Sequence, residues 1–207
     1  MAAWLVASAV AEEKMPPPVV ASIETGELED FDANPPEVRA LIEKALALTK
    51  RNLGYKYGSS EPESGGMDCS GTIFHVLEEM GVDDVPRTAS DQYVWARKTG
   101  DFQAVVSRSE DSFELDALRP GDLLFWTGTY EIDRDPPVTH TMIYLGELKS
   151  DGRPVMFGAS DGRTFDGRKM SGVSVFDFRI PKAPSEGGPG SVFVGYAPIP
   201  GLGRSTE

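Results

Sequence analysis

The stretch Met67-Asp68-Cys69-Ser70-Gly71 decides how the middle of this chain folds, because it contains the only cysteine and marks the start of a helix. Turn-forming residues precede it. An apolar pattern at helical spacing follows it, formed by Ile73, Val76, Leu77 and Met80. Asp68 is a favourable N-cap residue, since its carboxylate can accept hydrogen bonds from the free amides of a first turn. The pattern therefore predicts a helix with Cys69 in its first turn.

This position gives Cys69 a chemical interpretation. The positive end of a helix dipole favours a thiolate over a thiol, and the thiolate is the nucleophilic form. We therefore expect a partly exposed, reactive thiol. A buried cysteine that packs as a small hydrophobic residue is the alternative.

A thiol nucleophile needs a base, and the sequence contains two histidines. His75 follows Cys69 on the same predicted helix but on a different face. His140 lies in 138–146, where β-branched and apolar residues ending in glycine predict a strand. His140 is therefore the candidate base, although the local sequence also allows a purely structural role.

Four segments then resemble the NlpC/P60 cysteine peptidases in content and order: DCSG at 68–71, PRTAS at 86–90, LRPGDLLFW at 118–126 and VTH at 138–140. The resemblance extends from about Leu53 to about Ala159 and is weaker at 194–196. It implies an α+β fold with a papain-like NlpC/P60 core, in which N-terminal helices pack on an antiparallel sheet. It also implies that Cys69 and His140 form a catalytic pair.

The resemblance suggests two further site residues. Tyr55 matches a family tyrosine that can hydrogen-bond at the oxyanion site, although it can also be an aromatic residue at the edge of the core. Arg87 can bind a carboxylate of a peptidoglycan stem peptide. Pairing with a neighbouring acid is the equally open interpretation of Arg87.

The third catalytic position departs from the family pattern. The family places His, Asn or Gln on the strand after the histidine strand, and the matching residue here is Gly158. No third histidine exists, and no Asn or Gln follows Gln103. Ser160 or Asp161 can take the position after a register shift. We expect a carbonyl, a water or a hydroxyl near 158–160 to orient His140, and a site without its orienting side chain to react more slowly.

Composition narrows the class of protein. A chain of 207 residues that is 40% hydrophobic can bury a single core. A net charge of -13 argues against nucleic-acid binding. A single cysteine excludes an intrachain disulfide. The sequence has no His/Cys cluster with metal-ligand spacing, so we expect neither a metal nor another cofactor.

The chain divides into four parts: a truncated signal peptide at 1–11, a linker at 12–33, the catalytic domain at 34–200 and a tail at 201–207. The first part is apolar and ends in an Ala-x-Ala site, which predicts a periplasmic or secreted protein, and it is too short to span a bilayer. In the domain, a helix from Pro36 and two more helices precede five strands, at 122–126, 138–145, 153–158, 173–178 and 191–197.

Together these features predict a cysteine endopeptidase or amidase that hydrolyses peptide or isopeptide bonds in peptidoglycan stem peptides through an acyl-thioester. Because a fold does not fix a reaction, two alternatives stay open. One is a non-hydrolytic wall-binding or scaffold protein on the same fold. The other is a related acyltransferase.

Overall fold

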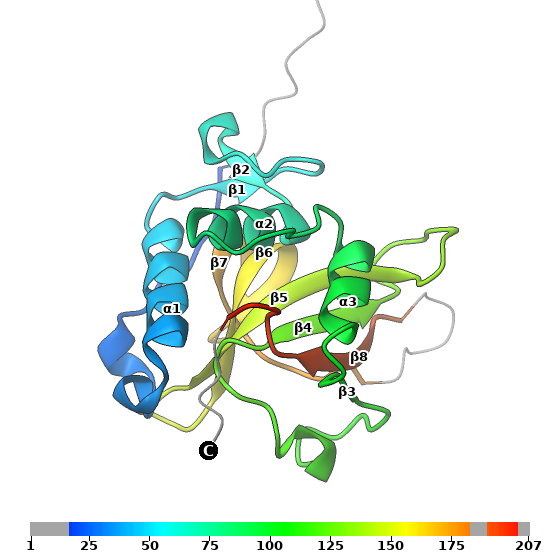
Figure 1. Ribbon diagram of the computed structural model, residues 1–207. Helices are drawn as coiled ribbons and strands as arrows, with labels where there is room; N and C mark the ends of the chain where they lie inside the picture. The colour runs from blue at the N-terminus through cyan, green and yellow to red at the C-terminus, as the bar shows by residue number, and fades with distance from the viewer. Residues whose placement is uncertain (1–16, 183–189, 203–207) are drawn as a thin grey trace, which may run out of the picture.

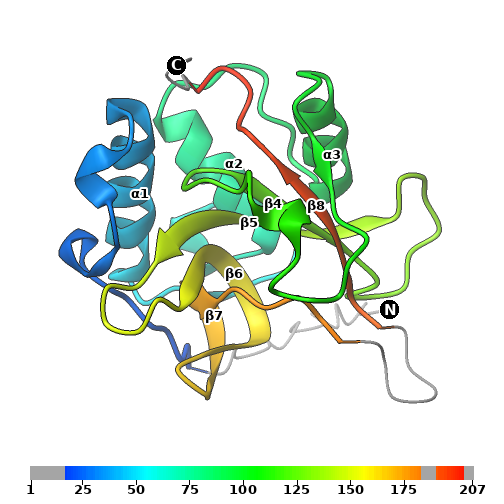
Figure 2. The ribbon, with the colours of Figure 1, turned by 90° about the horizontal axis from the view of Figure 1, so that it is seen from below.

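The computed structural model describes residues 17–182 and 190–202. Within them, three α-helices lie on one face of a six-stranded antiparallel sheet (Figures 1 and 2). The helices are α1 (Pro36–Thr49), α2 (Cys69–Glu79) and α3 (Ala89–Arg97). The predicted α+β architecture is confirmed.

The sheet has the strand order β3-β8-β4-β5-β6-β7. Its members are β3 (Gln103–Ala104), β4 (Leu123–Thr127), β5 (Val138–Glu147), β6 (Pro154–Phe165), β7 (Arg168–Asp177) and β8 (Val192–Ala197). A separate parallel pair, β1 (Gly54–Tyr55) and β2 (Gly66–Met67), leads into α2. The short 3-10 helices are Thr25–Glu27, Phe31–Ala33, Pro62–Ser64 and Phe113–Leu115.

Local chemistry explains where the helices begin. α1 has proline in its first turn, where the missing amide proton costs no hydrogen bond. Asp68 caps α2 by accepting from the amide of Gly71, and Thr88 caps α3 by accepting from the amide of Asp91. The predicted start of the cysteine helix is thus confirmed.

The sheet separates two apolar clusters. The larger one lies between the helices and the sheet and includes Phe125, Ile143 and Leu145. The second lies on the other face and includes Trp126, Met142 and Tyr144. His140 pairs directly opposite Trp126, so its side chain belongs to the second face.

The hairpin of β6 and β7 is longer than the sequence predicted. It turns at Asp166-Gly167, where both residues have positive φ (51° and 70°), as a tight hairpin turn requires. Before that turn, the register changes from Asp161 opposite Ser171 to Thr164 opposite Lys169. β6 therefore contains one extra residue, a β-bulge. Beyond the bulge, each side chain of β6 faces the opposite side of the sheet from the one that regular alternation would give it.

The linker prediction is wrong for residues 17–33. Val19 forms a bridge with Ser171 of β7, and Ile23 and Leu28 are buried. The proposed signal peptide at 1–11 and the last residues of the tail, 203–207, lie outside the described residues. Among the helices of the described part, none is long and apolar enough to cross a membrane.

Candidate active site

Cys69 lies where α2 meets the sheet. Its thiol donates to the carbonyl oxygen of Thr139, the residue before His140, with 3.9 Å between sulfur and oxygen. The side chain is buried, and burial, followed by the negative charge of Asp68, raises the thiol pKa to about 11. The expectation of a partly exposed, activated thiol is therefore wrong for this conformation.

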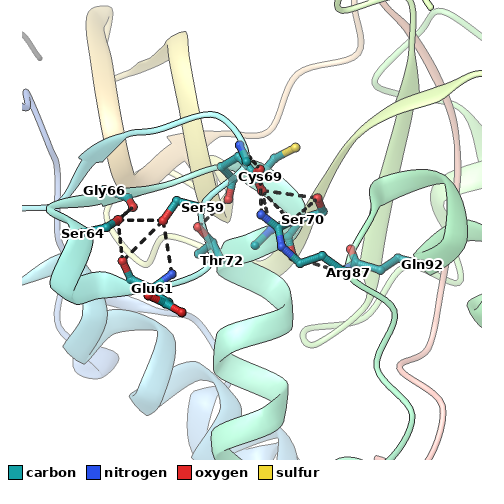
Figure 3. Close-up of polar contacts among 12 residues, drawn as sticks. Ser59, Glu61, Ser64, Gly66, Cys69, Ser70, Thr72, Arg87 and Gln92 are labelled. Carbon is teal, nitrogen blue, oxygen red and sulfur yellow. Dashed lines mark hydrogen bonds and ion pairs between the residues drawn. The ribbon is translucent and has the colours of Figure 1, made fainter. Parts of the chain in front are cut away.

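Asp68 is the polar centre of the helix start. Its carboxylate accepts from the amides of Gly71 at 2.6 Å and Gly58 at 2.7 Å. Both oxygens also accept from Arg87, at 3.0 and 2.9 Å, and Arg87 donates to the Ser70 hydroxyl at 3.2 Å. Figure 3 shows Arg87 reaching the start of α2 beside Cys69 and Ser70. Arg87 is thus paired with a neighbouring acid, which is the alternative to substrate binding that the sequence left open.

Position 71 requires glycine for a steric reason. A side chain there would collide with the backbone carbonyl of Ser59 and with the guanidinium of Arg87. The loop after β1 can therefore pack against the first turn of α2 only when this position is glycine.

His140 is buried in β5, with its ring 5.7 Å from that of Trp126. Its Nε2 accepts a hydrogen bond from Nε of Arg163 at 3.3 Å. Burial, followed by the positive charge of Arg163, lowers the His140 pKa well below its usual value. The imidazole is therefore neutral in this conformation, with its proton on Nδ1.

Arg163 reaches the imidazole because of the bulge in β6. Strict alternation from Ser160 would turn Arg163 to the opposite face, and the extra residue reverses that phase. The guanidinium lies 4.2 Å from the ring centroid of Trp126, a cation–π contact. Burial lowers the Arg163 pKa to about 10. Sequence reasoning missed Arg163, although Gly162 within a strand is a signal for a bulge.

The expected third position must be corrected. Gly158 lies against Met142, because a Cβ at Gly158 would be 3.0 Å from Met142 Cγ. Ser160 and Asp161 line the cavity next to His140, but the side chain that bonds the ring is Arg163. The expectation that a carbonyl, a water or a hydroxyl orients His140 is wrong, since a charged donor does so.

Two adjoining cavities open beside these groups. One, of about 500 Å³, is lined by His140 and Arg163. The other, of about 230 Å³, is lined by Cys69 and Arg87. Tyr55, Tyr130 and Thr139 line both. Tyr55 therefore lies between the cysteine and histidine sides, and burial raises the pKa of its hydroxyl.

His75 lies apart from this region. It is 3.6 Å from Glu79 on α2 and lines a different depression, together with Lys44 and Arg51 of the α1 region. Its predicted position away from the cysteine face is confirmed.

Helices packed on an antiparallel sheet, with a cysteine at a helix start and a histidine on a strand, are typical of papain-like proteins. The chain belongs to the NlpC/P60 family, which matches residues 52–172, more than half of its length. The homologues of this family member include proteins named as an endopeptidase and a hydrolase.

Two curated relatives are similar over part of their length. The probable endopeptidase YafL of Escherichia coli K12 is 30% identical over 109 residues, which is 52% of this chain and 37% of YafL. The gamma-DL-glutamyl hydrolase of Bacillus subtilis 168 is 26% identical over 161 residues, 74% of this chain and 33% of that protein. The chain thus matches about a third of the length of each.

A solved structure is also similar. It is a lipoprotein-like NLP/P60 family protein from Staphylococcus aureus Mu50, with 23% identity and a TM-score of 0.49. The match covers 79% of this chain and 41% of the other.

Proposed function

We propose that this chain is a cysteine peptidase or amidase that hydrolyses peptide or isopeptide bonds in peptidoglycan stem peptides. The observation that carries the proposal is the contact of the Cys69 thiol with the backbone of Thr139, directly before His140. This contact lies where the two cavities adjoin, so a peptide in them would pass both side chains. Membership of a family with hydrolase relatives supports the same reaction class.

The reaction would proceed in two halves. His140 takes the thiol proton, and the Cys69 sulfur attacks the scissile carbonyl carbon to form a C–S bond. The imidazolium then gives its proton to the leaving nitrogen as the C–N bond breaks, which leaves an acyl-thioester. A water attacks this thioester, gives a proton to His140 and releases the acid. That proton returns to the sulfur and restores the thiol.

The tetrahedral intermediates carry an oxyanion that needs donors. We assign this role to the backbone amide of Cys69, which is free of an intrahelical partner at the first position of α2, and to the hydroxyl of Tyr55. The position of Tyr55 on both cavity walls supports the assignment.

The non-hydrolytic, wall-binding alternative also has a specific observation in its favour. The bond from Arg163 to His140 describes a neutral imidazole, and the raised Cys69 pKa describes a neutral thiol. A protein fixed in this state would bind wall peptides without cutting them.

Incubation with purified muropeptides, followed by mass spectrometry, separates the candidates. Hydrolysis adds one water across a single bond, an acyltransferase joins the acyl group to an added amine, and a binding protein leaves the masses unchanged. C69S is the matched control, because it replaces one atom of the nucleophile. We further propose that the catalytic domain comprises 34–200 together with the packed segment 17–33, and that the protein acts outside the cytoplasm, where stem peptides lie.

A further inference from the structure

The contact between Arg163 and His140 is incompatible with proton transfer from Cys69. A guanidinium has five donors and no acceptor, so Nε2 must offer a lone pair to receive it. An imidazolium carries a proton on both nitrogens and has no lone pair to offer. Whichever nitrogen takes the thiol proton, His140 therefore cannot become an imidazolium while Arg163 stays bonded to it.

Arg163 is half-buried, and in the described part of the chain it lacks the carboxylate partner that such a guanidinium usually has. Within 17–182 and 190–202, no carboxylate forms an ion pair with Arg163. Asp161 lines the same cavity, yet Arg163 donates to His140 and lies over the face of Trp126. Burial lowers the Arg163 pKa, and the charge that Arg163 interacts with is that of Cys69, which raises this pKa. By contrast, Arg87 and Arg153 are both paired with aspartates.

The cavity supplies room for the missing partner. Arg163 and His140 line the same space of about 500 Å³, which adjoins the cavity of Cys69. A carboxylate there would meet a donor geometry that suits it, because guanidinium and carboxylate form two parallel hydrogen bonds. Such a pair is stronger than a single hydrogen bond to a neutral imidazole.

We propose that Arg163 binds a free carboxylate of the peptide substrate and that, until this carboxylate arrives, it holds His140 in a form that cannot take the thiol proton. The inference rests on the proposed function, since it assumes that His140 serves as the base. It assigns to the larger cavity a ligand class, a peptide with a free carboxylate near the scissile bond. It makes Arg163 a specificity-determining residue that also positions the base.

The direct test is the protonation of the His140 ring. Uniformly 15N-labelled histidine gives two imidazoles in this chain, and H75Q leaves only that of His140. Long-range proton–nitrogen spectra at pH 7.5 then identify which nitrogen carries the proton. We expect a protonated Nδ1 and an unprotonated Nε2 in the free protein. A free protein with protonated Nε2 would overturn the proposal.

The carboxylate is tested with a matched pair of peptides, in a C69A background that prevents turnover. One is acetyl-L-alanyl-γ-D-glutamyl-L-lysine, which has a free α-carboxylate on its glutamyl residue. The other is the same peptide with that carboxylate amidated. The acid peptide should bring a proton onto Nε2 of His140. With the amidated peptide, the spectrum should be the same as that of the free protein. Equal spectra with both peptides, or no change with either, would refute the carboxylate as the trigger.

Arg163→Gln provides a test that needs no peptide. Glutamine offers a carbonyl oxygen that can accept from Nε2–H, so R163Q permits an imidazolium. Removing the Arg163 charge by itself disfavours the Cys69 thiolate, so any acceleration must come from the released imidazole. At pH 7.5, iodoacetamide should alkylate Cys69 of R163Q about tenfold faster or more, the change that a one-unit fall in thiol pKa produces. R168Q removes an exposed guanidinium from the same hairpin and should react as the wild type does. Equal rates in R163Q and R168Q would show that Arg163 does not restrain the pair.

These measurements also distinguish failure of the inference from failure of the proposed function. If R163Q releases the imidazole and speeds alkylation but cleaves no muropeptide, the inference stands and the hydrolase proposal fails. If the wild type cleaves both acid and amidated peptides equally well, the hydrolase proposal stands and the carboxylate inference fails.

Discussion

The carboxylate of Asp68 joins the start of α2 to Arg87. One oxygen accepts from the Gly71 amide at 2.6 Å and from Arg87 at 3.0 Å, while the other accepts from Arg87 at 2.9 Å. A single buried acid therefore fixes the first helical turn and the loop that leads to α3. The same negative charge helps to keep the adjacent Cys69 protonated.

Asp68→Asn should separate the structural role of the Asp68 carboxylate from its effect on the Cys69 thiol. Asparagine is a good N-cap, but the change removes the charge that holds Arg87, so the free energy of unfolding should fall by about 2 kcal/mol. Loss of the same charge should lower the Cys69 pKa and speed alkylation at pH 8. Urea unfolding and iodoacetamide kinetics measure the two quantities.

Arg87→Met is the counterpart. It should destabilise the fold to a similar extent but slow alkylation, because it leaves the Asp68 charge without its counter-ion. Alkylation that changes in the same direction in both variants would mean that loosening of the helix, rather than charge, controls the thiol.

Cys69→Ser and His140→Ala should each abolish muropeptide cleavage while the proteins remain folded. A serine in place of Cys69 lacks the nucleophilicity of a thiolate, and His140→Ala removes the proposed base. His75→Ala should cleave at the wild-type rate, since His75 lies in a different depression. Turnover by C69S at the wild-type rate would exclude thiol catalysis.

His140 should make the fold sensitive to acid. Its folded pKa is lowered, so the stability it contributes is present above the ordinary value near 6.5 and is lost as pH falls below it. Between pH 7.5 and pH 5, the wild type should lose up to about 2 kcal/mol more unfolding free energy than His140→Gln does. Urea titrations at the two pH values measure this difference. His75→Gln should lose as much unfolding free energy between the two pH values as the wild type does. An equally large loss in His140→Gln would mean that another group causes the acid sensitivity.

Gly158→His is expected to destabilise the protein rather than to complete the site. The first added carbon would meet Met142 Cγ at 3.0 Å, and overpacking of this kind costs about 1–3 kcal/mol. Gly158→Ala should already show most of the loss in thermal unfolding. Wild-type stability in G158A, or faster cleavage by G158H, would contradict the placement of this residue against Met142.

Much of the architecture could be predicted because its signals are local. Asp68 before an apolar helical pattern marks the start of α2, and the β-branched and apolar residues around His140 mark β5. Glycine and proline punctuation placed four strands within one residue of their observed starts and placed β7 five residues too late. These signals depend only on residues that are close in sequence, so they can be recognised in one sequence alone.

The state of the site could not be predicted, because it depends on contacts between distant segments. Cys69 becomes buried only when β5 packs against α2. Arg163 reaches His140 only because a bulge shifts the phase of β6, and the hairpin turns at Asp166-Gly167 although Asp161-Gly162 has the same two residue types. Isolated apolar residues such as Ile23 have no periodicity, so the sequence alone predicts a linker in the N-terminal segment.

That segment has a consequence for anyone who shortens the chain. β7 is the outermost strand, and its amides at Ser171 and Val175 donate to Val19 and Ala21. An uncovered edge strand is a template on which another chain can add and aggregate. Removing residues up to 16 leaves this cover in place. Removing residues up to 22 would leave only the bond from Val173 to Leu53 among these edge contacts and would uncover the amides of Ser171 and Val175, which should favour self-association.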